Sequence, residues 1–260
     1  MKIRLFLALS LCAASLSAQA PAASTEANFK ESSMEARFQI DLKVPDEVIK
    51  PYLPAGFTSA VAKQGPAKDC NVRLIFVDRI TVNGPDGKPV GAGNSRQVFF
   101  AAPVKDAAGA NAQLILGGLT DEPADAPGPF GNYLQAAKHE MKRATSTNAN
   151  GAVMDTQDWV FEAKSGEHLE MHISYERGSG NRSGRPQEVK FYSAKTPYAE
   201  VSHQEQVLEI LRNTTTNPPD KVKSFSLKIS GGSFAKFAPA VESPLSWDNI
   251  VWLDRQITTP

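Results

Sequence analysis

Cysteine and histidine are scarce in this sequence, with two and four residues respectively among 260. Cys12 lies in an apolar N-terminal stretch that we expect to be removed, which leaves Cys70 as the only thiol. No internal disulfide can then form, so a disulfide-stabilised scaffold is excluded. The fold must depend on core packing, for which a chain of about 240 residues is long enough.

An excess of either charge is also missing, as are several common sequence signatures. The chain carries 28 basic and 28 acidic residues, so nothing favours a nucleic acid as partner. It has no Gly-x-Ser-x-Gly elbow, no Walker motif and no dinucleotide-binding glycine pattern, so we expect no serine-hydrolase site and no cofactor. Beyond residue 22, no apolar run is long enough to cross a bilayer, so we expect no membrane anchor.

The first residues have the pattern of a secretory signal peptide. Lys2 and Arg4 precede an apolar run over 5–14, and Ala18-Gln19-Ala20 follows as a small-residue cleavage pattern. Because Pro21 comes next, cleavage after Ala22 or Ala23 is the alternative to cleavage after Ala20. We therefore assign residues 1–22 to a signal peptide and expect a periplasmic protein, with 26 basic against 28 acidic residues left.

Strand-like patterns dominate the rest of the chain. Residues 23–34 are small and polar and predict a disordered lead-in, and 35–260 predict a single domain. A short helix and turn are expected over 45–57, and a hairpin around Ser165-Gly166. These patterns predict a mainly antiparallel β-barrel or sandwich with a few short flanking helices. The expected strands are 36–44, 70–82, 95–105, 111–119, 156–164, 168–177, 188–194, 222–230 and 250–257.

One longer helix is predicted over 132–144. Leu134, Ala137, Lys138 and Met141 would share one stripe of that helix. A lysine on an apolar stripe with another cation, Lys142, one turn away would have a lowered pKa and could act as an amine nucleophile. The alternative is that Lys138 extends from the edge of the stripe to water.

The stretch EHLEMHISYER (167–177) places His168, Glu170 and His172 on one face of a predicted strand. Three interpretations are open. The face is the polar outer surface of a sheet, or it lines a polar barrel interior, or it supplies metal ligands with His203 as a further donor. Spacing alone supports the third, and we assign no metal residue.

The order of segments resembles the acetoacetate decarboxylase-like superfamily. An N-terminal strand, VPDEVIKPYLPAGF (44–57) and the strand CNVRLIFVDRI (70–80) are similar to its opening, with the LPAGF turn (53–57) as the sharpest motif. SRQVFFAAPVK (95–105) and SPLSWDNIVWLDRQI (243–257) resemble its next strand and its C-terminal strand. The resemblance covers about residues 35–257 and implies a β-barrel or cone with an enclosed pocket.

The resemblance also implies an active-site lysine in a Pro-Lys-Lys segment and a glutamate on the middle strand. This sequence has Gln97 at the glutamate position and no Pro-Lys-Lys, so Lys138 and Lys142 are only near candidates for the lysine. Acetoacetate itself is therefore not the expected substrate.

From these observations we predict a periplasmic lyase, a decarboxylase acting on a small organic (keto or aromatic) acid. Arg96, Gln97 and Lys142 would bind the substrate, Lys138 would form an imine, and Glu170 with His172 would protonate the carbanion. Two alternatives remain open: a non-catalytic periplasmic binding protein, and a metal-dependent enzyme that uses the His168, Glu170 and His172 face. Homo-oligomer formation is also left open.

Overall fold

The computed structural model describes residues 29–122 and 130–260, and strands make up most of them. The helical segments are α1 (Asp46–Ile49), η1 (Lys50–Tyr52) and η3 (Gly232–Glu242). The strands are β1 (Phe29–Leu42), β2 (Thr58–Ser59), β3 (Val72–Asn83), β4 (Ser95–Lys105), β5 (Asn111–Thr120), β6 (Tyr133–Thr147), β7 (Val153–Ala163), β8 (His168–Glu176), β9 (Asn181–Arg182), β10 (Gln187–Ser193), β11 (Ala199–Asn213), β12 (Val222–Ser230) and β13 (Ser246–Thr258).

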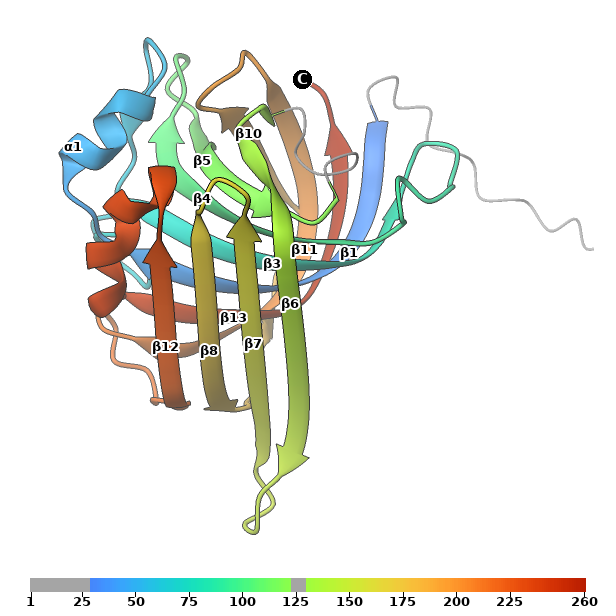
Figure 1. Cartoon of the computed structure of the whole chain (residues 1–260), viewed down its shortest axis with the longest axis vertical. Coiled ribbons are helices and arrows are strands. Elements are labelled where there is room, and N and C mark those ends of the chain that lie inside the picture. The colour runs from blue at the N-terminus through green and yellow to red at the C-terminus, as the bar shows by residue number, and fades with distance from the viewer. Residues whose placement is uncertain (1–28, 123–129) are drawn as a thin grey trace, which may run out of the picture.

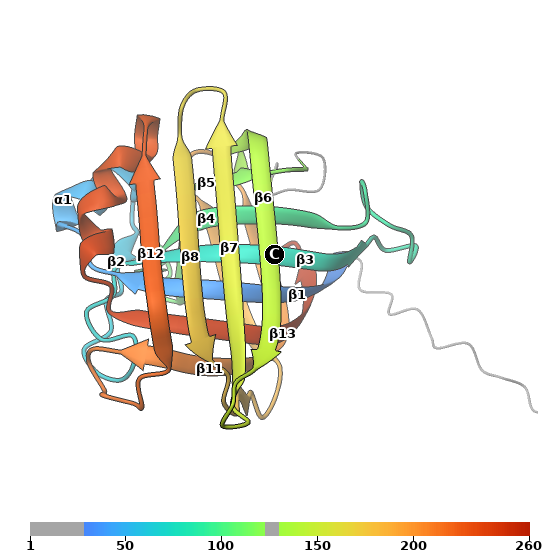
Figure 2. The same ribbon diagram turned by 60° about the horizontal axis from the view of Figure 1, so that its bottom comes forward.

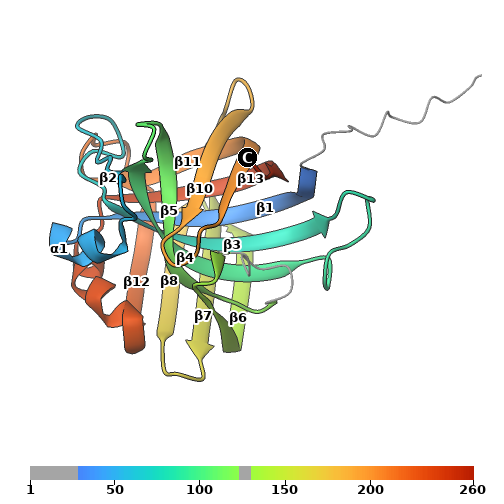
Figure 3. The ribbon, with the colours of Figure 1, turned by 90° about the horizontal axis from the view of Figure 1, so that it is seen from above.

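Seven strands close into a barrel. Their order is β5-β10-β11-β13-β1-β3-β4, and pairing of β4 with β5 closes the ring (Figures 1 and 3). Most neighbours are antiparallel, whereas β5 and β10 are parallel. The remaining long strands, β6, β7, β8 and β12, continue the sheet from β5 and fold back as a second layer across the barrel wall (Figure 2). The predicted β-barrel with short helices is confirmed.

The larger hydrophobic core lies between these two layers, and a smaller apolar cluster that includes Phe99, Ile115 and Phe191 lies on the interior face of the barrel. Along β1, Phe38, Ile40 and Leu42 are fully buried and face the larger core, because alternate residues of a strand point to opposite sides. Trp159 of β7 and Met171 of β8 approach from the second layer. Each such side chain contributes about 1.5–3 kcal/mol by its removal from water. The other face of every barrel strand is therefore free to carry polar side chains into the barrel.

Most of the predicted strands, the helix and turn over 45–57 and the hairpin at Ser165-Gly166 are confirmed. The predicted lead-in is wrong over residues 29–34, because β1 begins at Phe29 and pairs there with Thr258. The predicted signal peptide falls outside the described residues. In the described part of the chain, no helix is long and apolar enough to cross a membrane.

The predicted helix over 132–144 is wrong. This segment is strand β6, which pairs antiparallel with β7 from Ala136 to Thr147. Almost all of its residues after Gln135 are exposed, so no apolar helical stripe is buried anywhere along it. The few apolar residues fitted a helical period by chance, and pairing with the strongly strand-forming β7 decided the conformation.

Candidate functional site

One end of the barrel interior contains a cavity of about 340 Å³. That volume is at the lower end of the range for small-molecule sites, about 300–1,000 Å³. Its wall is part apolar and part charged, and its residues come from all seven barrel strands, from β6 and from segments that adjoin these strands. They are Lys30, Glu31, Arg37, Arg79, Gln97, Phe99, Ile115, Phe130, Tyr133, Phe191, Tyr198, Glu200, Arg255, Ile257 and Thr259.

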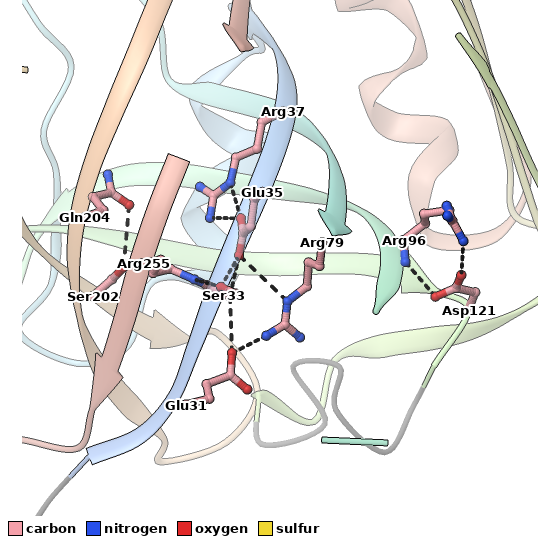
Figure 4. Close-up of polar contacts among 10 residues, drawn as sticks. All are labelled: Glu31, Ser33, Glu35, Arg37, Arg79, Arg96, Asp121, Ser202, Gln204 and Arg255. Atoms are coloured by element: carbon pink, nitrogen blue, oxygen red, sulfur yellow. Dashed lines mark hydrogen bonds and ion pairs between the residues drawn. The ribbon is translucent and has the colours of Figure 1, made fainter. Parts of the chain in front are cut away.

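Glu35 organises the charged part of the wall. Its carboxylate accepts hydrogen bonds from Arg37 Nε at 2.6 Å and from Ser33 Oγ at 2.8 Å, and it lies 2.8 Å from Arg255 Nη2 (Figure 4). Arg79 Nε is 3.7 Å from the same carboxylate. One glutamate thus holds three guanidinium groups together, although the four side chains are only 0–8% exposed.

The strand register explains why these residues meet. Glu35 lies opposite Arg79 across the β1–β3 pair, and Ser33 lies opposite Arg255 across the β1–β13 pair. Residues opposite one another on neighbouring strands point to the same face of the sheet. Glu31, one step further along β1, contacts both Arg79 and Arg255 and completes the cluster (Figure 4).

The charge of the cluster favours an anionic ligand. Burial alone would raise the pKa of Glu35, but Arg255, Arg37 and Arg79 together outweigh it and lower this pKa to about 2. Three guanidinium groups therefore face two carboxylates, those of Glu31 and Glu35. Lys30 adds a fourth cation to the wall and Glu200 adds a third carboxylate, so the formal charge of these groups is positive by one when all are ionised.

Glu200 is the carboxyl group best placed to exchange a proton. It is 6% exposed and accepts a hydrogen bond from Tyr198 Oη at 3.2 Å. Desolvation by burial raises its pKa, and Arg255 only partly opposes this effect. A proton on Glu200 makes the cavity more positive by one charge and also supplies a general acid.

The rest of the wall is largely aromatic and contains one unsatisfied polar atom. The ring centroid of Tyr133 is 6.0 Å from that of Phe99 and 6.4 Å from that of Phe130. Burial raises the pKa of the Tyr133 hydroxyl well above its usual range, so this residue stays neutral. Gln97 Oε1 is buried and accepts no hydrogen bond from the described residues. A ligand that donates a hydrogen bond would satisfy it.

With this geometry the chain can be compared with known proteins. No protein-family model matches the sequence, and no curated protein matches it. Among solved structures, the chain is similar to the enduracididine biosynthesis enzyme MppR, which was solved in complex with the condensation product of pyruvate and imidazole 4-carboxaldehyde. The TM-score is 0.51 and the sequence identity is 11%, and the match covers 88% of this chain and 87% of that chain. An acetoacetate decarboxylase-like enzyme from Sphingomonas wittichii RW1 is similar with a TM-score of 0.50 and 12% identity over 88% and 90%.

The fold is that of the acetoacetate decarboxylase-like superfamily. Within this acetoacetate decarboxylase-like barrel, the only lysine that lines the cavity among the described residues is Lys30, and it is exposed. The described wall therefore contains no buried lysine.

Of the predicted substrate-binding residues, the structure places Gln97 in the cavity wall. Arg96, its neighbour on β4, points away from the cavity and lies near Asp78 and Asp121, at 3.5 and 3.9 Å (Figure 4). Lys142 is exposed on β6 and does not line the cavity. The structure therefore brings only one of these three predicted residues to the site.

The three predicted catalytic residues lie outside the cavity. Lys138 is 56% exposed on β6 and pairs with Glu140, so the buried helical stripe on which its lowered pKa depended does not exist. His172 of β8 lies on the outer face of the second layer, 2.7 Å from Asp158 and 3.0 Å from Ser224. Glu170, on the same face, pairs with Lys228. Of the three interpretations of this face, the structure supports the polar sheet surface.

The structure does not group the predicted metal ligands into a site. His168 Nε2 lies 3.6 Å from Glu170 and Nδ1 lies 4.0 Å from Glu162, which are contacts of an exposed ion-pair network. Within residues 29–122 and 130–260, no three His, Cys, Asp or Glu side chains lie close enough together to hold a metal ion.

Sequence reasoning missed the charged cluster, namely Glu31, Glu35, Arg37, Arg79, Glu200 and Arg255. One signal was present in the segment 36–44, where the apolar residues alternate with Arg37, Gln39 and Asp41. In an open sheet with one face on the core, such alternation gives one buried and one solvated face. In a closed barrel, the polar face points into the interior.

A second polar cluster lies further along the barrel interior. Gln39 Nε2 donates to both Asp41 and Asp248, at 3.1 and 3.4 Å, and Ser246 Oγ donates to Asp248 at 2.7 Å. Burial and the neighbouring Asp41 raise the pKa of Asp248 to about 7. These two carboxyl groups share one amide donor, so their simultaneous ionisation is unfavourable.

Replacing Asp248 with asparagine is expected to stabilise the protein at alkaline pH. A raised folded-state pKa means that wild-type stability falls as pH rises from about 4 to 7, because ionisation of Asp248 costs more in the folded than in the unfolded state. At pH 9 the variant should gain about 2–4 kcal/mol in the free energy of unfolding, with little difference at pH 4. Urea unfolding at both pH values measures this. A variant that is less stable than wild type at pH 9 would contradict the assignment.

Proposed function

We propose that this protein is a carbon–carbon lyase, in the first instance a decarboxylase, which acts on a small organic acid inside the barrel cavity. The observation that carries the proposal is the buried cluster of Arg37, Arg79 and Arg255 in the wall of a largely apolar cavity. Buried guanidinium groups are suited to binding carboxylate and keto oxygens, because their N–H groups match the spacing of such acceptors.

The proposed reaction uses a β-keto acid, whose carboxylate is bonded to the carbon next to the keto group. Its anionic end lies at the guanidinium groups, with the keto oxygen within hydrogen-bond reach of one of them. When the bond to the carboxylate breaks, carbon dioxide leaves and the bonding electron pair moves onto the keto oxygen to form an enolate. The same guanidinium groups then stabilise the negative charge where it develops.

Protonated Glu200 completes the proposed cycle. It donates its proton to the carbon that carried the carboxylate, which restores the keto group, and regains a proton from water. Tyr198 donates a hydrogen bond to Glu200 and keeps its carboxyl group oriented. Lys30 is exposed at the rim, so this mechanism uses a hydrogen-bonded enolate in place of an imine.

The second candidate function is a binding protein without catalysis. The lack of a buried lysine in the described wall favours it, because imine formation then offers no route to cleavage.

Both candidates are consistent with export, and we propose that residues 1–22 direct the protein to the periplasm. N-terminal sequencing of protein from the periplasmic fraction checks that part, since a retained Met1 would contradict it.

A panel of β-keto acids and aryl-substituted keto acids distinguishes the two functions. Each acid is incubated with the mature protein, and the rate of carbon dioxide release is compared with the spontaneous rate without protein. The lyase proposal predicts catalysed release from at least one acid, with competitive inhibition by stable carboxylates that fill the cavity. Tight binding of several acids without any release would establish the binding protein instead.

A further inference from the structure

We infer that the cavity selects a monocarboxylate that bears a planar aromatic ring, with the ring lying against Phe99 and Tyr133. This inference rests on the proposed function, because it specifies the substrate class of the same site. It follows from the shape and composition of the uncharged half of the wall, of which the proposed chemistry uses only the hydroxyl group of Tyr198.

Five aromatic side chains line that half of the wall: Phe99, Phe130, Tyr133, Phe191 and Tyr198. The ring of Phe130 is nearly parallel to that of Tyr133, at 18°, and the ring of Phe99 is tilted by 31° to Tyr133. Tyr198 meets Phe130 edge-on, at 81° and 5.0 Å. A flat aromatic ring can contact such a wall in two ways: by offset stacking on the face of one ring, and by edge-to-face contact with another.

These aromatic residues are held by rigid elements. Phe99 lies on β4, where it is paired with Ile75 of β3 and Gly118 of β5, and Phe191 lies on β10 opposite Glu200. Both are 6–7% exposed, so they cannot rotate away without opening the barrel wall. The ring-binding surface is therefore preorganised, which reduces the entropy lost when a ligand binds.

Tyr133 connects the aromatic and charged halves of the site. Its ring lies beside Phe99 and Phe130, while the charges of Glu200, Arg255, Arg37 and Arg79 all act on its hydroxyl group. A ligand that spans from ring to carboxylate would follow the same path along the wall. The guanidinium groups are gathered in a single cluster around Glu31 and Glu35, so the wall offers one position for a carboxylate.

The test compares phenylacetate with cyclohexylacetate, which have the same charge and similar size but differ in planarity. Titration calorimetry on the mature wild-type protein is expected to give about three- to tenfold tighter binding of phenylacetate. Phe99→Leu should reduce this preference to less than twofold while cyclohexylacetate binding changes little. Phe225→Leu is the matched control, because Phe225 packs against Trp247 outside the cavity, and it should keep the preference.

The outcomes separate this inference from the proposed function. Equal binding of the two acids, or a preference that survives in Phe99→Leu, overturns the aromatic substrate class and leaves the organic-acid site intact. Failure of both acids, and of acetate and pyruvate, to bind the folded wild-type protein overturns the site itself and the proposed function with it. Circular dichroism of each variant confirms that the comparison is made on folded protein.

Discussion

Glu35→Gln is expected to lower the free energy of unfolding by about 3–5 kcal/mol, because it removes the charge that holds three buried guanidinium groups together. Glutamine has the same shape, so the loss would not come from a cavity. Arg37 contacts Glu35 through two nitrogens, at 2.6 and 2.5 Å, and would be left as a buried cation without its main anionic partner. Urea unfolding at pH 7 measures the change.

The same residue gives an acid-sensitive stability. Its folded-state pKa is about 2 against an ordinary value of 4.5, so its contribution is fully present above pH 4.5 and is lost as pH falls toward 2. The difference corresponds to about 3 kcal/mol at neutral pH. Glu31→Gln is the matched control, since this side chain is 15% exposed and should have a smaller effect. If the free energy of unfolding of Glu35→Gln were within about 1 kcal/mol of the wild-type value, the three arginines would not depend on the charge of Glu35.

Glu200→Gln is expected to reduce turnover of the best keto acid by about 10²–10⁴-fold while changing its binding much less. Glutamine can still accept the hydrogen bond from Tyr198 but cannot deliver a proton to the carbanion. Steady-state kinetics, with binding measured separately by calorimetry, distinguishes the loss of chemistry from the loss of affinity.

The pH dependence adds a second readout. Wild-type activity should fall as pH rises through the raised pKa of Glu200, because the ionised carboxylate cannot act as an acid. The residual activity of Glu200→Gln should not show this decrease with rising pH. Glu205→Gln is the control on the same strand, since Glu205 pairs with Arg182 away from the cavity. Unchanged turnover in Glu200→Gln would remove this residue from the mechanism.

The fold was largely predictable because most strands carry their own periodicity. VKSFSLKIS and CNVRLIFVDRITV alternate or are rich in β-branched residues, and both form strands where expected. The order of these segments also indicated the fold, which the similar solved structures share. Strand β6 was not predictable from its own sequence, because its residues are exposed on both faces and only pairing with β7 fixes its conformation.

The candidate site was mostly not predictable, since it is assembled from residues far apart in the sequence. Arg255 lies opposite Ser33 because β13 pairs with β1 in one particular register. No local sequence pattern in either strand specifies that register. Gln97 was found through the family resemblance, which marked its position as an active-site position. By contrast, His168 and His172 were candidate site residues because they share one face of a strand, but this face of β8 is directed toward solvent.

A crystal structure of the mature protein with bound phenylacetate tests the central claim most directly. We predict that its carboxylate lies within hydrogen-bond distance, about 2.7–3.2 Å, of the Arg37 or Arg255 guanidinium group. Its ring should lie against Phe99 and Tyr133 inside the barrel. Density for the acid on the outer sheet face near His172, or anywhere else outside the barrel while the cavity holds only water, would contradict the account.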